Sequence, residues 1–129
     1  MKEDYCSLEI SKLLKDKGFN EICAGYYDRK GRFDMTLSKV NNIRWEGHYI
    51  AGNISAPTLQ MAMAWLREKD VYIEIRHSFA EYGDKPQYFG SIYSKNEEFD
   101  KKAACFLRMK NKYEDAVEDV LKYCLTNLI

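Results

Sequence analysis

The chain has 129 residues, of which 46% are hydrophobic and 14% aromatic, and its 20 basic and 20 acidic side chains cancel to a formal net charge of zero. This composition excludes a disordered or fibrous protein and predicts a single folded domain over residues 1–129. No third of the sequence departs from neutrality by more than one charge. The chain therefore has no long-range field that would attract nucleic acid or an anionic membrane.

The first predicted element is a helix over residues 7–17. Its apolar side chains recur at helical spacing and form one stripe of Cys6, Ile10, Leu13 and Leu14. Gly18 can adopt the left-handed conformation that follows a last helical turn, and Phe19 can fold back on Leu14. The sequence therefore predicts a glycine C-cap at the end of this helix.

A β-hairpin is predicted next. Residues 24–28 and 32–37 are rich in strand-forming side chains and flank a tight turn, Arg29-Lys30-Gly31. The following stretch, residues 38–56, is interrupted by asparagine and glycine. We expect a loop there with at most one short strand.

The second predicted helix opens at Ser55-Ala56-Pro57 and runs to about Lys69, because proline is tolerated in a first helical turn. One face carries Leu59, Ala62, Met63 and Leu66. Beside it, Met61 and Trp65 form a second apolar strip that a surface helix does not need. Either residues 38–56 cover this strip, or the strip is a self-association or partner surface on which Trp65 is exposed in the monomer.

Three strands are predicted after the second helix. Residues 71–76 alternate apolar and polar side chains, and a turn over residues 81–86 leads to a second strand at 87–94. The stretch 97–110 fits either a helix or a strand. We favour a strand over residues 103–109.

The last predicted element is a helix that Asn111 caps, with Glu114 completing a capping box. Its apolar stripe is continuous and consists of Tyr113, Ala116, Val117, Val120, Leu121, Cys124 and Leu128. The order helix, hairpin, helix, two to three strands, helix predicts the α+β class. We expect a small, mainly antiparallel sheet packed with three helices.

Four groups of residues carry a resemblance to known proteins. They are Tyr5-Cys6 with Leu13-Leu14-Lys15 and Lys17-Gly18-Phe19; Tyr27-Asp28 with Gly31; Ala56-Pro57-Thr58-Leu59-Gln60-Met61-Ala62-Met63 with Trp65-Leu66-Arg67-Glu68; and Tyr113-Glu114-Asp115-Ala116 with Leu121-Lys122-Tyr123-Cys124-Leu125 and Asn127-Leu128. The chain resembles small uncharacterised proteins of phages and prophages in Bacteroides-like bacteria and, more distantly, the phage α/β/α sandwich domain. The resemblance implies a mobile-element origin and a fold, but no catalytic residue.

Catalytic and metal-binding patterns are weak. The four cysteines lack the short spacing of zinc sites, and we predict free thiols with no metal or cofactor. Asp70 and Glu74, with Arg76, have the acidic-acidic-basic spacing of some metal-dependent nucleases, but we favour an ordinary solvated strand face, because such sites generally have lysine in place of Arg76. His48 with Glu46, and His77 with Cys105, are candidate acid–base or nucleophile pairs.

We therefore predict a non-catalytic accessory module of unknown biochemical activity that binds an unidentified protein partner or associates with itself. The alternatives are a nucleic-acid-binding protein, which the neutral charge disfavours, and a metal-dependent hydrolase. The N-terminus is charged from Lys2, and the longest apolar run, residues 61–66, is too short to span a bilayer. We expect a cytoplasmic protein that does not contact a membrane.

Overall fold

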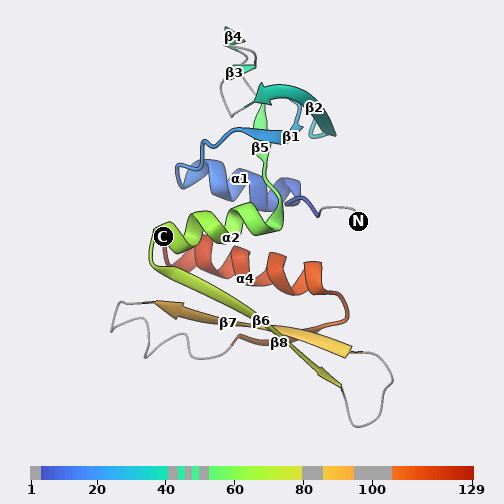
Figure 1. Cartoon of the computed structure of the whole chain (residues 1–129), viewed down its shortest axis with the longest axis vertical. Helices are drawn as coiled ribbons and strands as arrows, with labels where there is room; N and C mark the ends of the chain where they lie inside the picture. Colours follow the sequence, from blue (N-terminus) through green and yellow to red (C-terminus); the bar gives the residue numbers. More distant parts are fainter. Residues whose placement is uncertain (1–3, 41–43, 46–47, 50–52, 80–85, 95–105) are drawn as a thin grey trace. The chain divides into compact units, whose positions relative to one another are not determined.

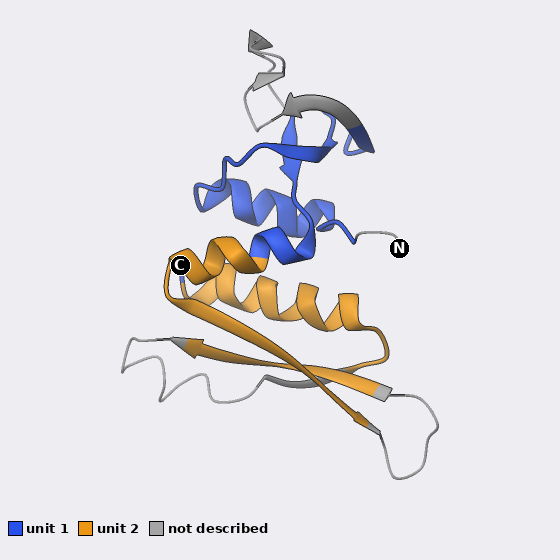
Figure 2. Cartoon of the chain, viewed as in Figure 1, with its two compact units in different colours: residues 1–62, 129 blue, residues 63–128 orange. Residues whose placement is uncertain are grey.

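The computed structural model describes residues 4–40, 44–45, 48–49, 53–79, 86–94 and 106–129. These residues form three helices and two antiparallel sheets (Figure 1), which confirms the α+β class. The strands form two sheets where the sequence predicted one. The chain divides within its second helix into two compact units, residues 1–62 with Ile129 and residues 63–128 (Figure 2).

Helix α1 spans Leu8–Asp16, and both of its ends follow from the sequence. The Ser7 side chain accepts a hydrogen bond from the backbone N–H of Ile10 at 3.3 Å, which makes it an N-cap. Gly18 has a φ of 97°, and the N–H of Phe19 donates to the carbonyl of Leu14 at 2.9 Å. Phe19 is buried, so the predicted glycine C-cap is confirmed.

The first sheet has the strand order β4-β3-β2-β1-β5. Its strands are β1 (Cys23–Tyr27), β2 (Phe33–Val40), β3 (Arg44–Trp45), β4 (His48–Tyr49) and β5 (Ile54–Ala56). Strands β1 and β2 form the predicted hairpin around Gly31, whose φ is 76°. Strand β5 pairs with the other edge of β1. The predicted loop with at most one short strand over residues 38–56 is wrong, because β3, β4 and β5 all lie in that stretch. The sequence missed β5 because a three-residue strand depends on that distant partner and carries little local signal.

Helix α2 spans Leu59–Glu68, so the predicted start at Ser55-Ala56-Pro57 is wrong. The N-terminal segment holds the residues before the helix in an extended conformation. The carbonyl of Pro57 accepts from the N–H of Cys6, and the N–H of Leu59 donates to the carbonyl of Asp4, each at 2.9 Å. The Thr58 hydroxyl then accepts from the N–H of Met61 at 3.2 Å, as an N-cap side chain does.

The second sheet has the order β6-β7-β8, with bounds Val71–Phe79, Pro86–Ser94 and Phe106–Lys110. Strands β6 and β7 pair without interruption from Val71 opposite Ser94 to Phe79 opposite Pro86. The strand interpretation of 103–109 is confirmed from Phe106 onward. Residues 103–105 and most of the predicted turn at 81–86 lie outside the described residues.

Helix α4 spans Tyr113–Asn127 and packs along one face of the β6-β7-β8 sheet (Figure 1). Its buried side chains match much of the predicted stripe and are Ala116, Val117, Val120, Leu121, Cys124 and Leu125. The predicted capping box is wrong, because Lys112 is the N-cap residue and no side chain caps the helix. Glu114 and Asp115 instead lie in the first turn, where negative charge favours the helix dipole.

The contact between α4 and β7 requires glycine at position 90. A Cβ atom added to Gly90 would overlap the Cγ2 atom of Val120 and would also touch Ile75. Val120 is fully buried, so it has no open space into which to move. The backbone of β7 therefore lies directly against the helix.

We predict that Gly90→Ala lowers the free energy of unfolding by about 1–3 kcal/mol, because overpacking forces the helix away from β7. Urea denaturation monitored by circular dichroism measures the change. Val120→Ala removes the overlapping methyl groups. The double variant should therefore be more stable than the sum of the two single changes predicts. Strict additivity of the two changes would contradict the proposed contact.

Candidate functional site

The predicted nuclease-like residues form a surface ion pair. Glu74 and Arg76 lie on the same exposed face of β6, with 3.2 Å between Arg76 Nε and Glu74 Oε1. The hydrogen bond from Arg76 lowers the pKa of the Glu74 carboxyl. Asp70 lies in the turn between α2 and β6 and has a φ of 61°. Within the described ranges, no group of three or more His, Cys, Asp or Glu residues could hold a metal ion.

The two histidines lie in different sheets. His48 belongs to β4, where its backbone is opposite Trp45, and its predicted partner Glu46 lies outside the described residues. His77 is exposed on β6, with its ring centroid 6.5 Å from that of Tyr88. Tyr88 in turn meets Tyr113 edge to face at 6.0 Å. Cys105, the predicted partner of His77, is also outside the described residues.

The described cysteines have the properties of core residues. Cys6, Cys23 and Cys124 are free thiols and are buried. Burial, reinforced by the charge of Glu21, raises the pKa of Cys23 to about 11. Burial raises the pKa of Cys124 to about 12. Because the thiolate is the nucleophilic form, neither side chain is poised for covalent catalysis near neutral pH.

The Met61 and Trp65 strip is not an exposed surface. Trp65 is 8% exposed, and the Lys69 ammonium lies 4.5 Å from the centre of its indole ring. Met61 is half-buried. A partner surface on this strip would need an exposed indole, and the structure does not provide one.

The first sheet presents a different apolar surface. Phe33 and Met35, two residues apart on β2, lie on the same face of the sheet and are 42% and 53% exposed. The Phe33 ring packs against Tyr5 and Tyr27, with centroid distances of 5.2 and 5.5 Å. Sequence analysis placed Phe33 in a hairpin but had no signal for its exposure, because alternation alone does not show which face is covered. We call Phe33 and Met35 the hairpin pair.

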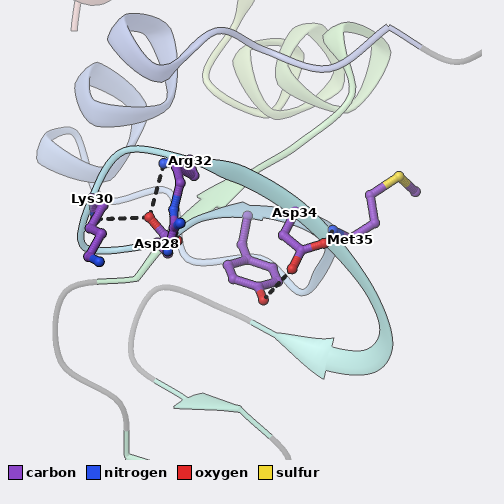
Figure 3. A network of polar contacts seen from close by, with 6 residues as sticks. Asp28, Lys30, Arg32, Asp34 and Met35 are labelled. Carbon is purple, nitrogen blue, oxygen red and sulfur yellow. Dashed lines mark hydrogen bonds and ion pairs between the residues drawn. The ribbon is translucent and has the colours of Figure 1, made fainter.

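The hairpin that carries this pair is held rigid by Asp28 (Figure 3). Its carboxylate accepts hydrogen bonds from the backbone N–H groups of Lys30 and Arg32 at 2.8 and 2.9 Å, and it pairs with the Arg32 guanidinium at 3.1 Å. The bond from the Arg32 backbone is the main reason that the pKa of Asp28 is lowered. In a separate set of contacts, Asp34 accepts hydrogen bonds from the N–H of Met35 at 2.8 Å and from the Tyr26 hydroxyl at 3.4 Å.

The second sheet has an exposed tyrosine pair. Tyr72 and Tyr93 are directly opposite on β6 and β7 and are 37% and 44% exposed. The guanidinium of Arg76 donates to the Tyr93 hydroxyl at 3.2 Å as well as to Glu74. This face therefore combines aromatic surface with a charge pair that is already neutralised.

Comparisons of the chain with protein-family models, with curated protein sequences and with solved structures found no match. Among the described residues, no helix has the length and apolar character needed to cross a bilayer.

We predict that Cys23 and Cys124 resist a thiol reagent such as DTNB at about pH 8 until the protein unfolds, because their thiolates are disfavoured.

The raised pKa values of the two thiols also make the free energy of unfolding depend on pH. Above the ordinary thiol pKa of 9.0, the unfolded chain loses protons that the folded chain keeps. The free energy of unfolding should therefore fall from about pH 9 toward 11 and 12, by on the order of 1 kcal/mol per pH unit for each thiol. Rapid labelling of either thiol in the folded protein would contradict the raised pKa values on which both predictions depend.

Proposed function

We propose that this protein is a non-catalytic interaction module that binds a protein partner through the hairpin pair. The observation that carries the proposal is the joint exposure of Phe33 and Met35 on one face of a strand. Methionine adapts to different partner surfaces, and aromatic side chains are enriched at the centres of interfaces. The Asp28 network pre-organises the hairpin, which reduces the entropy lost on binding.

The charges of the hairpin indicate the chemistry of the partner. Arg29 and Lys30 are exposed in the turn, whereas the Arg32 guanidinium pairs with the Asp28 carboxylate. A partner that places an apolar side chain on the hairpin pair can therefore place acidic side chains beside these cations. We infer an acidic segment that contains an aromatic or aliphatic anchor.

Single-stranded nucleic acid is the second candidate, because the same hairpin combines cations with an aromatic ring. Two observations favour the protein partner. The Phe33 ring already packs against two tyrosine rings, which limits its use as a base-stacking platform. The net charge of the chain is zero. We further propose a cytoplasmic location, because the longest apolar run, residues 61–66, is too short to span a bilayer. The sequence resemblance alone supports an origin in a phage or another mobile element.

A displayed random peptide library, selected on the purified protein, tests the proposal. We expect enriched peptides to carry acidic residues around an apolar anchor. Met35→Gln should weaken the binding of a selected peptide about tenfold, because it replaces an apolar contact with a polar group. Fluorescence anisotropy of the labelled peptide measures the affinity.

Ile22→Gln is the matched control, because Ile22 is exposed to a similar extent, 55%, and lies outside β1 and β2. The control variant should bind the peptide with unchanged affinity. Equal binding by wild type and Met35→Gln would contradict the proposal. Tight, steeply salt-dependent binding of a labelled oligothymidylate, abolished by Lys30→Glu, would favour the nucleic-acid candidate instead.

A further inference from the structure

The two edges of the β6-β7-β8 sheet differ in their capacity to pair with another strand. Strand β8 is five residues long, and its register with β7 is irregular between Tyr88 and Gly90. A short, irregular strand is a poor template for further pairing. Strand β6 has nine residues, contains neither proline nor glycine, and pairs with β7 without a bulge. Among the described residues, no strand pairs with its other edge.

An edge strand of this length has unpaired backbone N–H and C=O groups that can extend the sheet. Its composition also favours strand pairing, because valine, isoleucine and tyrosine occupy positions 71, 72, 73 and 75. Ile73 and Ile75 point toward the helix-covered face but are only half-buried. Part of the apolar surface of Ile73 and Ile75 is therefore still available for contact.

We propose that β6 pairs antiparallel with β6 of a second copy of this chain, about a two-fold axis at Ile75. This register uses all nine residues of the strand, from Val71 opposite Phe79 to Phe79 opposite Val71. It also places Glu74 of each copy directly opposite Arg76 of the other. The two half-buried Ile75 side chains then meet at the axis and cover one another.

The charges of Glu74 and Arg76 favour this register over the registers in which the two-fold axis lies one residue away. Moving the two-fold axis by one residue in either direction places Glu74 opposite Glu74 or Arg76 opposite Arg76, and like charges directly opposite one another destabilise a strand pair. Charged residues on an edge strand usually prevent self-pairing. Here Glu74 and Arg76 already pair along one strand, and a symmetric antiparallel pair of strands adds two attractive contacts between the copies.

The self-association uses the second sheet, whereas the proposed partner site uses Phe33 and Met35 of the first, so each proposal can fail without the other. Sedimentation equilibrium over a range of protein concentrations measures the dimer dissociation constant. Glu74→Arg and Arg76→Glu should each raise it by at least about tenfold at low salt, because each creates two repulsive contacts. The double variant Glu74→Arg/Arg76→Glu restores opposite charges and should return the dissociation constant close to that of the wild type.

Glu68→Arg makes the same charge change at an exposed residue at the end of α2 and should leave the dissociation constant unchanged. Circular dichroism and thermal melting establish that each variant is folded. A wild-type chain that is monomeric throughout the concentration range would overturn the proposal. So would a folded double variant that dimerises no better than the single variants.

A cysteine placed on the axis tests the register independently. In a Cys105→Ala background, Ile75→Cys places two thiols opposite one another, with about 4.5–5.5 Å between their Cα atoms, which suits a disulfide. Air oxidation should give a covalent dimer on a non-reducing gel. Ile73→Cys in the same background faces His77 of the second copy, leaves both charges in place and should cross-link far more slowly. Equal cross-linking of the two variants would overturn the Ile75 register.

Discussion

The contact between Val120 of α4 and the backbone of β7 at Gly90 sets the geometry of the second unit. Because no side chain intervenes, the helix lies directly on the strand, and Val120 and its buried neighbours fill the space that a Cβ atom would occupy. Close packing of this kind holds a small sheet to a single helix. Helix α4 covers only one face of this sheet. Tyr72 and Tyr93 on the other face remain exposed, and among the described residues no strand pairs with the outer edge of β6.

In the first unit, a hydrogen-bonded turn and a close backbone approach at Gly25 hold the hairpin and its aromatic cluster together. Its hairpin has a short, well-ordered turn, because the Asp28 carboxylate satisfies two backbone N–H groups and the Arg32 guanidinium at once. Gly25 lies beneath the aromatic cluster, where a Cβ atom would come within 2.9 Å of both Tyr5 and Phe33. A rigid turn and a close backbone approach thus hold Phe33 in place. Met35, two residues further along β2, is left exposed.

The sequence was informative where the signal is local. The Ser7 N-cap, the Gly18 C-cap, the hairpin turn and the buried stripe of α4 all depend on residues within one or two helical turns of each other. It was uninformative where distant segments decide the structure. Strand β5 and the delayed start of α2 exist because β1 and the N-terminal segment pair with residues 54–59. The exposure of Met35 and the burial of Trp65 likewise follow from tertiary packing, which periodicity does not encode.

The central proposal is that a second copy of the chain pairs with the outer edge of β6, where no strand pairs among the described residues. Amide hydrogen exchange, resolved residue by residue by NMR at low and high protein concentration, tests it most directly. Along β6, the N–H groups that bond to β7 alternate with those that face the open edge. The account predicts that the edge-facing amides exchange quickly in dilute solution and more slowly as the concentration rises, while those bonded to β7 are protected throughout. Edge-facing amides that exchange at one rate, fast or slow, across the whole concentration range would contradict it.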